Sequence, residues 1–242
     1  MSELVYKKIY PVTVNDRDFN NRLTPEAILN FVQDNNERQM VELGLGYDDL
    51  LKEGFIALIL RTKYEVLTDD LSGLTDIEVI TWPQKPGRVE HNRDFLIYNV
   101  DGTPLIKGTS LWVVVDYKTR MIQRGNVVSY AVTTFKQANF KEPLNKLKDV
   151  PALVNEDKMK HEVKFTDLDE NKHLNNTKYA RIILDALELS IDENIKTFEI
   201  DYVSEVKYGE TLKIAYNRDG KHIDIAGYNE GGVSMRARID LY

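Results

Sequence analysis

A stretch of twelve residues in the first half of the chain recurs in the second half. Residues 12–23 (VTVNDRDFNNRL) align without gaps on residues 163–174 (VKFTDLDENKHL), with a valine, two aspartates, an asparagine and a leucine identical. Each stretch precedes a segment with helical periodicity, and several strand-like segments follow that helix. Two polar loops that matched by chance would have no reason to share this order of elements. The match therefore predicts a duplicated fold, made from two copies of one unit.

Each half contains one segment in which apolar residues recur with the period of an α-helix, about 3.6 residues. The first spans about residues 24–43 and the second about residues 176–189. The expected N-caps are Thr24 for the first helix and Asn175 or Asn176 for the second, and Gly44 is the expected C-terminal stop of the first. We therefore expect one long helix in each half.

After each helix the period of the apolar residues changes to two, which is typical of half-buried strands. The expected strands are residues 56–66, 77–82, 89–100 and 104–117 in the first half, and 196–206, 211–216, 222–228 and 232–241 in the second. One helix on an antiparallel sheet in each half is an α+β arrangement. We predict a first domain over residues 1–137, a linker over 138–158 and a second domain over 159–242.

The composition limits the chemistry that this chain can perform. It has no cysteine, which excludes disulfides, thiolate metal sites and a cysteine nucleophile. Its four histidines lack metal-ligand spacing, so we expect no metal and no cofactor. With 32 basic and 39 acidic residues, the net charge of −7 argues against a general nucleic-acid binder. The sequence lacks an apolar leader and an apolar run of about 18 residues, so we expect a cytoplasmic protein without membrane insertion.

The two copies of the repeat differ where catalysis would need a titratable group. Arg22 in the first copy corresponds to His173 in the second. Arginine stays protonated at any working pH, whereas histidine titrates near neutrality and can act as a general base. Asp169, Asn171 and His173 alternate, so in an extended loop their side chains share one face. Any chemistry of the repeated loop therefore belongs to the second copy.

This second loop runs into the N-terminus of the second expected helix, where free backbone N–H groups can stabilise a developing oxyanion. A carboxylate and an imidazole at such a place can activate water, and an amide can orient that water or a carbonyl. These parts suit hydrolysis of an acyl compound. A structural interpretation stands beside it, because Asp, Asn and His are common turn and capping residues before a helix. Asp167 fits that role best, since Asp16 is its equivalent.

The second loop also carries a family resemblance. Residues 167–179 (DLDENKHLNNTKY) resemble the signature of acyl-acyl carrier protein thioesterases, the plant and bacterial enzymes that end fatty-acid synthesis. Further similar segments are Thr81-Trp82, Arg93-Asp94-Phe95, SLWVV at 110–114, Thr119-Arg120 and DYVSE at 201–205, so the resemblance covers nearly the whole chain. It implies a tandem hot-dog fold, in which two long helices are each wrapped by antiparallel sheet.

The resemblance assigns catalytic roles to four residues of this sequence, Asp169, Asn171, His173 and Glu205. The family was also discussed in terms of a cysteine directly after that glutamate, and here the position is Val206. A cysteine mechanism is therefore impossible, and water activated by a carboxylate and histidine remains. Whether Asp169 or His173 supported by Glu205 is the base stays open. The first half would house the acyl chain, with the apolar face of its helix and Phe55, Ile56, Leu58, Ile59 and Leu60 as candidate lining residues. For each of these residues, a place in the ordinary core is the alternative interpretation.

The implied partner is acyl carrier protein with a fatty acyl chain on its phosphopantetheine. That carrier is acidic, so basic side chains are candidates for docking it. These candidates are Lys172, Lys178 and Arg181 near the second loop, and Arg61, Lys63, Lys85, Arg88 and Arg93 in the first half. A duplicated chain already contains the pairing that single hot-dog proteins reach by dimerising, so we expect a monomer or a homodimer.

Three other functions stay open at the level of sequence. A thioesterase for coenzyme A thioesters would use the same thiol chemistry without the carrier protein. A non-catalytic acyl-binding protein would need neither His173 nor Glu205. A hydratase or dehydratase on a similar fold would also need an acid–base pair, although the resemblance favours hydrolysis.

Overall fold

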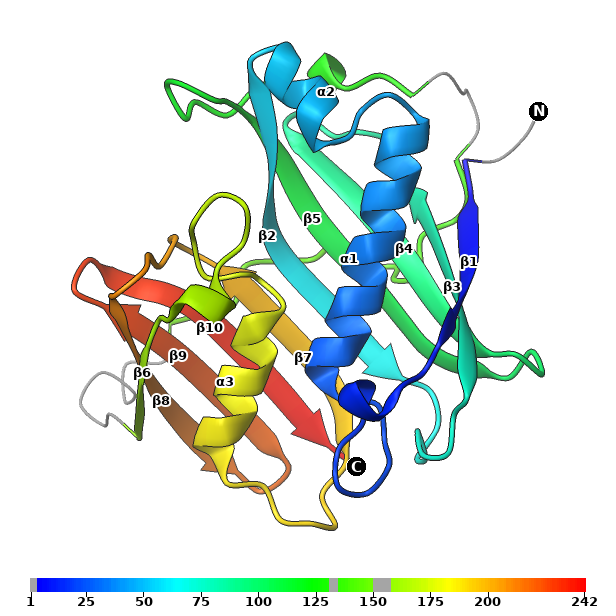
Figure 1. The fold of residues 1–242 in the computed structure, drawn as a ribbon, viewed down its shortest axis with the longest axis vertical. Coiled ribbons are helices and arrows are strands. Elements are labelled where there is room, and N and C mark those ends of the chain that lie inside the picture. Colours follow the sequence, from blue (N-terminus) through cyan, green and yellow to red (C-terminus); the bar gives the residue numbers. More distant parts are fainter. Residues whose placement is uncertain (1–3, 131–134, 150–157) are drawn as a thin grey trace.

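Two helices lie against one face of a single antiparallel sheet in a computed structural model of the chain (Figure 1). The structure describes residues 4–130, 135–149 and 158–242. Within these ranges the sheet has ten strands in the order β1-β3-β4-β5-β2-β7-β10-β9-β8-β6. No helix in the described ranges combines the length and the apolar character that crossing a membrane requires.

The elements follow the same order in both halves. The first half contains β1 (Tyr6–Pro11), α1 (Pro25–Glu42), the short α2 (Tyr47–Lys52), β2 (Phe55–Val66), β3 (Asp76–Pro83), β4 (Glu90–Asn99) and β5 (Pro104–Asp116). The second half contains β6 (Met159–Glu162), α3 (Lys178–Leu187), β7 (Ile195–Tyr202), β8 (Thr211–Asp219), β9 (His222–Asn229) and β10 (Gly232–Leu241). Short 3-10 turns lie at Val14–Asp16, Gly125–Val127 and Phe165–Asp167.

The sheet repeats one strand order on either side of its centre. From the outer edge inward, the first half reads β1-β3-β4-β5-β2 and the second reads β6-β8-β9-β10-β7. The innermost strands β2 and β7 pair with each other, with Arg61 opposite Asp201 and Tyr64 opposite Phe198. The rings of Tyr64 and Phe198 stack with centroids 5.4 Å apart, which seals the junction of the two halves. The predicted duplication and the tandem α+β fold are confirmed.

The repeated stretches adopt the same turn. In the second copy the side chain of Asp169 accepts two backbone N–H bonds, and in the first copy Asp18 does the same. One residue of each turn has a positive φ, 62° at Asn21 and 63° at Lys172. The sequence identity at the aspartates is therefore explained by backbone geometry alone, because a short acceptor side chain holds this turn.

The two helices differ in length, which corrects the expectation of two long ones. α1 has 18 residues and begins as predicted, with the Thr24 hydroxyl accepting the Ala27 N–H. α3 has only 10 residues and begins two residues later than expected. Its N-cap is Thr177 rather than Asn175 or Asn176, and the side-chain oxygen of Asn175 accepts the Thr177 N–H at 3.0 Å in the turn before the helix. At the other end, Glu188 turns the chain away with φ of 50°.

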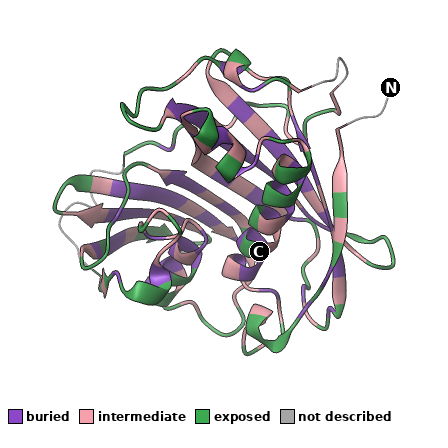
Figure 2. Ribbon diagram, turned by 45° about the horizontal axis from the view of Figure 1, so that its top comes forward, coloured by how far each residue is buried: buried purple, intermediate pink, exposed green. Residues whose placement is uncertain are grey.

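The inner faces of the helices differ in polarity. α3 buries an entirely apolar face, including Ile182 and Ile183, against the sheet. Figure 2 shows buried residues on the helices as well as on the strands of the sheet. α1 buries Ile28 and Val32 near its start, but its later buried residues Asn35, Asn36 and Gln39 are polar. An inward polar face is costly unless its groups find partners. The C-terminal half of α1 is therefore a place to look for a site.

The described part of the predicted linker covers the sheet face that the helices leave open. Asn139 donates to the carbonyls of Phe95 and Gly108, which anchors this segment on β4 and β5. The Phe140 ring lies under the ammonium groups of Lys63 and Lys107. The domain limits at 137 and 159 stay a prediction.

Candidate active site

The four residues predicted for catalysis come from two neighbouring segments of the second half. Asp169, Asn171 and His173 lie on the loop before α3, and Glu205 lies on the segment after β7. A β-bridge between His173 and Lys207 holds the two segments together. The His173 Nε2 and Glu205 Oε2 atoms are 3.4 Å apart. The structure therefore brings the predicted imidazole and the distant glutamate together.

Glu205 reaches this position because β7 ends four residues earlier than predicted. The N–H groups of Val203 and Ser204 both bond the carbonyl of Ser234, and the chain then leaves the sheet. Val206, at the position discussed as a cysteine in the family, is fully buried and its carbonyl accepts the Leu174 N–H. Its side chain belongs to the core rather than to the site.

Asp169 holds the turn that places the other residues. Its Oδ1 accepts the N–H of Asn171 at 2.9 Å and the N–H of His173 at 3.1 Å. Asp18 makes the equivalent bonds in the first copy, which carries no histidine. A structural role for Asp169 is therefore shown by geometry, and a chemical role must be compatible with it.

Asn171 is held by a residue that the sequence did not single out. The hydroxyl of Tyr47, in the first turn of α2, donates to the Asn171 Oδ1 at 2.9 Å. This bond orients the amide with its oxygen toward Tyr47, so the NH₂ group of Asn171 points the other way and can donate to another group. Two backbone N–H groups near the start of α3, those of Thr177 and Lys178, already bond Asn175. The Asn171 NH₂ group is thus a candidate donor to a bound ligand.

A second missed residue comes from the loop after β5. Arg120, which has φ of 59°, forms an ion pair with the Oε1 of Glu205. Arg120, Glu205 and His173 form a row that joins the first half to the second. Glu205 is 40% exposed on its side chain, so solvent reaches this row. Arg120 lies in one of the segments that resemble the family, but neither it nor Tyr47 shows a periodicity or spacing that marks a site residue.

A cavity of about 550 Å³ lies between the loop before α3 and the first half. Asp169 and Asn171 border it, whereas His173 and Glu205 are not among its lining residues. Its other walls come from α1, α2, β4, β5 and the segment after β5, and they include Asn36, Met40, Leu50, Ala57, His91, Arg93, Trp112, Val114, Val128 and Tyr130. Of β2 only Ala57 takes part. The prediction that Phe55, Ile56, Leu58, Ile59 and Leu60 line this space is wrong, because none of them is among its lining residues. Phe55, Ile56, Leu58 and Leu60 pack in apolar clusters with residues of α2 and β5 instead.

The mouth of this cavity is acidic. Glu170 lies next to Asp169, and its pKa is raised by burial and by the nearby carboxylates of Glu37, Asp169 and Asp48. Deeper inside, Arg93 is buried and donates to the Gln39 side chain and to the Met40 sulfur. Among the residues that the structure describes, no group of three or more His, Asp or Glu side chains is placed to hold a metal ion.

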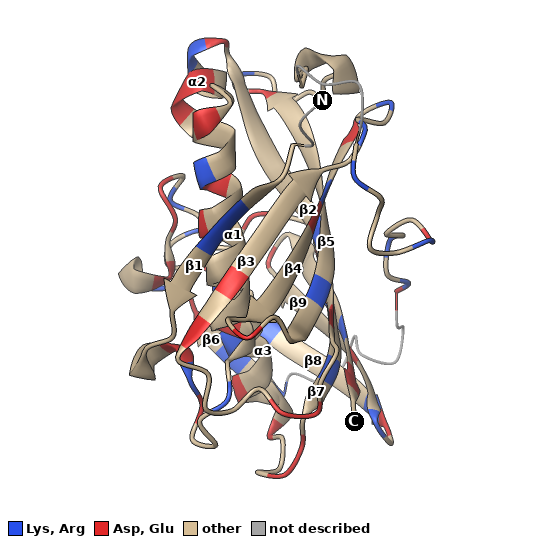
Figure 3. Cartoon of the chain, turned by 90° about the vertical axis from the view of Figure 1, so that its right-hand side faces the viewer, with Lys and Arg blue, Asp and Glu red and all other residues tan. Residues whose placement is uncertain are grey.

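The predicted docking residues do not form one surface. Arg93 is only 4% exposed, so it is wrong as a docking residue. Arg61 and Lys63 pair with Asp201 and Glu199 in the sheet. Lys178 and Arg181 pair with acidic side chains, and Lys172, Lys85 and Arg88 are exposed. Figure 3 shows the positions of basic and of acidic residues interspersed along the chain.

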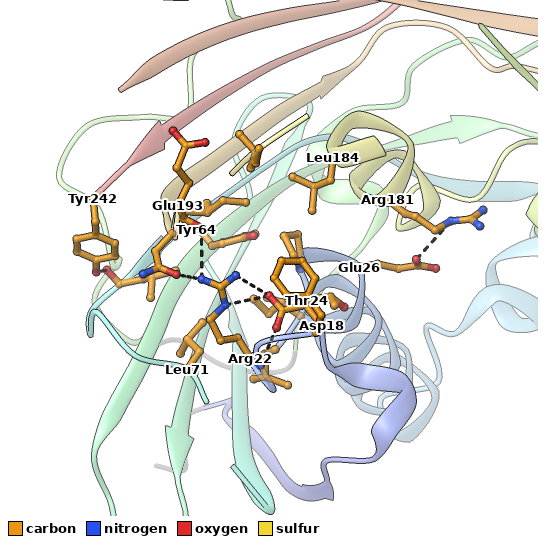
Figure 4. A pocket seen from close by; sticks show the side chains of 18 of the residues that line it. Asp18, Arg22, Thr24, Glu26, Tyr64, Leu71, Arg181, Leu184, Glu193 and Tyr242 are labelled. Atoms are coloured by element: carbon orange, nitrogen blue, oxygen red, sulfur yellow. Dashed lines mark hydrogen bonds and ion pairs between the residues drawn. The ribbon is translucent and has the colours of Figure 1, made fainter. Parts of the chain in front are cut away.

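A second cavity of about 540 Å³ repeats the first by the internal symmetry (Figure 4). It lies between the first copy of the repeated loop and the C-terminal end of α3. Arg22, the counterpart of His173, forms an ion pair with Asp18 and donates to the Asn194 side chain and the Glu193 carbonyl. Arg22 is thus a strut between the halves, and the first copy of the loop has no histidine at this position.

Comparison with known proteins agrees with this architecture. The profile of the acyl-ACP thioesterase N-terminal domain matches residues 3–128, and that of the C-terminal domain matches residues 152–239. The crystal structure of an acyl-ACP thioesterase from Bacteroides thetaiotaomicron superposes with a TM-score of 0.88 over all of both chains, at 22% identity. The 12:0-ACP thioesterase from Umbellularia californica gives 0.81 at 20% identity, covering 100% of this chain and 98% of that one. These likenesses show the shared tandem hot-dog fold.

Curated plant proteins are similar in sequence. The oleoyl-acyl carrier protein thioesterase of Coriandrum sativum is 26% identical over 92% of this chain and 61% of its own length. The palmitoyl-acyl carrier protein thioesterase of Arabidopsis thaliana is 25% identical over 84% of this chain and 52% of its own. This chain thus spans about half the length of the curated relatives it matches. Since the two family profiles together cover most of its residues, the chain belongs to the acyl-ACP thioesterase family.

Proposed function

We propose that this protein hydrolyses the thioester of fatty acyl-acyl carrier protein, releasing a free fatty acid and so ending fatty-acid synthesis. The observation that carries the proposal is the cavity shared by both halves, with Asp169 and Asn171 at its border and the His173–Glu205 pair on the same loop system. Family membership supports the reaction type.

In this proposal the thioester carbonyl lies beside Asn171, whose free amide N–H stabilises the developing oxyanion. A water molecule attacks the carbonyl carbon and gives its proton to a base. The carbon–sulfur bond then breaks, and the pantetheine sulfur leaves and takes up a proton. Two bases fit the geometry: Asp169 borders the cavity, and His173 is supported by Glu205 at 3.4 Å.

The two bases predict different pH dependence. An imidazole base loses activity as the pH falls through the range in which histidine takes up a proton, whereas a carboxylate base stays active to lower pH. The pH profile of kcat/KM under conditions where the fold is intact separates them. A pH profile without any ionisation between pH 5 and 8 would exclude His173 as the base. Any loss of activity on substituting His173 would then come from a changed position of the neighbouring site residues.

Thiol release tests the proposed function directly. The protein is incubated with a long-chain acyl carrier protein thioester and, in parallel, with the matching coenzyme A thioester. A thiol-reactive dye reports the product without background from the enzyme, because the chain has no cysteine. Fast release from the carrier thioester supports the proposal. Equal or faster release from coenzyme A would point to general acyl-CoA hydrolysis, and no release from either would point to an acyl-binding protein.

The proposal also includes the partner protein and the location of the enzyme. Acyl carrier protein is the proposed partner, docked through exposed basic residues such as Lys172 near the loop. Such docking predicts that the KM for the carrier thioester rises with salt, because screening weakens surface electrostatics. A KM that is independent of salt would contradict it. The cytoplasmic location expected from the sequence stays a prediction.

A further inference from the structure

The carboxylate of Glu205 has two oxygens that face different partners. Its Oε2 lies 3.4 Å from the Nε2 of His173, and its Oε1 forms an ion pair with the guanidinium of Arg120. The Glu205 side chain is 40% exposed, and in the part of the chain that the structure describes it has no third hydrogen-bond or ion-pair partner. An exposed carboxylate on a flexible side chain samples several rotamers unless a contact holds it. Arg120 is therefore the contact that can hold this carboxylate against His173.

The loop that carries Arg120 is fixed by its own hydrogen bonds. The N–H of Arg120 donates to the carbonyl of Asp116, and the N–H of Asp116 donates to the carbonyl of Met121. The Asp116 carboxylate accepts the N–H groups of Lys118 and Thr119. Within this turn Arg120 has φ of 59°, which is uncommon for a residue with a side chain and persists where the surroundings impose it. The turn thus aims a guanidinium of the first half at a carboxylate of the second.

The other charged and titratable groups around this row come from the loop before α3, the segment after β7 and α3 itself. They are Asp169, Lys172, Lys207 and Tyr179. The Asp169 Oδ1 already accepts two backbone N–H groups. Lys172 and Lys207 are exposed, and neither forms an ion pair with any residue that the structure describes. Arg120 is thus the cation that Glu205 binds.

We propose that Arg120 is a positioning residue, which holds Glu205 against His173 and so orients the imidazole toward the attacking water. This inference rests on the proposed function, in the alternative in which His173 is the base. Because the Nε2 atom faces the carboxylate, the Nδ1 atom is left to accept the proton of the water. Arg120 belongs to the first half and His173 to the second, so the base is oriented by contact between the two halves.

Steady-state kinetics on a carrier thioester tests the positioning. Arg120→Met keeps an unbranched side chain and removes the charge. We expect kcat to fall about 5-fold, the scale of a half-exposed ion pair, with KM nearly unchanged. Arg124→Met is the matched control and should keep kcat, because Arg124 is exposed on the same loop and has no ion-pair partner in the described ranges. An unfolding midpoint confirms that each variant is folded. Equal kcat values for the two variants, or a change in KM alone, would overturn the inference.

A double-variant cycle tests whether Arg120 acts through Glu205. In Glu205→Gln the side chain has no charge to pair with the guanidinium, so adding Arg120→Met should not lower kcat any further. A further 5-fold loss in that background would mean that Arg120 acts by another route, and it would contradict the proposed positioning.

The ring signals of His173 test the same inference without turnover. NMR follows the titration of the four histidines, and His173→Ala identifies the signal. A carboxylate held against the ring favours the protonated imidazole. Release of Glu205 in Arg120→Met should therefore move the titration midpoint to lower pH, towards that of Glu205→Gln. If Arg120 only neutralised Glu205, its removal would move the midpoint to higher pH.

The direction of this shift also separates the inference from the proposed function. A midpoint that is unchanged in Arg120→Met, or that moves to higher pH, would overturn the inference. If no carrier thioester is hydrolysed, the proposed function fails, and the shift of the His173 midpoint still decides whether Arg120 holds Glu205 in place.

Discussion

Asp169 shows how one side chain can serve structure and chemistry at once. Its Oδ1 holds the turn through the N–H groups of Asn171 and His173, and its carboxylate borders the cavity. An alanine variant would lose both roles and could not separate them. The internal repeat provides a control for this ambiguity, because Asp18 holds the same turn in a copy without a catalytic histidine.

The first prediction therefore replaces each of the two aspartates with asparagine, whose amide keeps the shape of the side chain. Asp169→Asn keeps an oxygen that accepts both N–H bonds and removes the negative charge. If Asp169 takes part in the chemistry, kcat falls by about 10²–10⁴ while the unfolding midpoint changes little. Asp18→Asn should leave kcat as it is. Thiol release and urea unfolding of both variants measure this, and equal kcat values for the two would reduce Asp169 to a turn residue.

The second prediction concerns the pair of His173 and Glu205. Groups that act as a unit show non-additive losses, since removing either one disables both. His173→Ala should lower kcat by about 10²–10⁴, and Glu205→Gln should lower it by a smaller factor. The double variant should lose no more than His173→Ala alone. Losses that multiply would show that the 3.4 Å contact has no catalytic meaning.

The helices and strands place these residues, and some of that placement could be predicted from the sequence. The loop from Asp169 to His173 was found because alternation and repetition are visible in one dimension. Tyr47 was missed because α2 has only 6 residues and its contact with Asn171 spans the two halves. The end of β7 differs from the prediction because apolar residues continue after Tyr202. In the structure, Val203 and Ser204 both bond the carbonyl of Ser234 on β10, and the chain then leaves the sheet. The burial of Arg93 could not be predicted, because it depends on Gln39 and Met40 of α1, which pack over this part of β4.

The third prediction tests the contribution of α2. Tyr47→Phe removes the hydroxyl that holds Asn171 and leaves the ring in place. Loss of one hydrogen bond corresponds to about 10-fold in rate, so kcat should fall about 10-fold with KM nearly unchanged. Steady-state kinetics measures the split. A change in KM alone would show that Tyr47 only shapes the cavity wall.

The fourth prediction concerns the buried carboxylate that fixes the start of the second half. Asp167 joins His161 of β6 and Arg181 of α3 at 2.9 Å each. Burial opposes its ionisation, but the Lys164 N–H and the charges of His161 and Arg181 lower its pKa below the ordinary 3.8. Its stabilisation is therefore complete above about pH 4 and is lost as the pH falls through the lower pKa of the folded state.

Asp167→Asn should accordingly lower the free energy of unfolding at pH 7 by about 2 kcal/mol, because the buried carboxylate loses the charge of its hydrogen bonds with the Lys164 N–H and with Arg181. The difference from the unmodified protein should shrink below pH 4. Asp16→Asn is the matched control. Asp16 makes the equivalent turn bonds at the surface, and among the described residues it forms no ion pair with a cation. Urea titrations between pH 3 and 7 measure this, and a difference that does not vary with pH would contradict it.

At the scale of the whole molecule, duplication explains why one chain suffices for a two-unit fold. Each cavity lies between one copy of the loop and the helix of the other half, so a single unit could not form either. The loop beside one cavity carries His173, and the loop beside the other carries Arg22 at the matching position, which binds Asp18 and Asn194 as a strut. A chain that encodes both units separately is free to diverge in this way, whereas a symmetric dimer would carry two identical sites.

The last prediction concerns the oligomeric state. β2 and β7 pair inside the chain, so the strands that face outward are β1 and β6, of 6 and 4 residues. Short edge strands resist pairing with a second sheet, and Lys7 and Lys8 on β1 add charge to that edge. Because both cavities are already complete within one chain, no second copy is needed to build a site. Light scattering during gel filtration should therefore give the mass of one chain across a wide concentration range, with full thiol-release activity in the same peak. A mass of two chains would contradict the prediction and would direct attention to β1 as the contact.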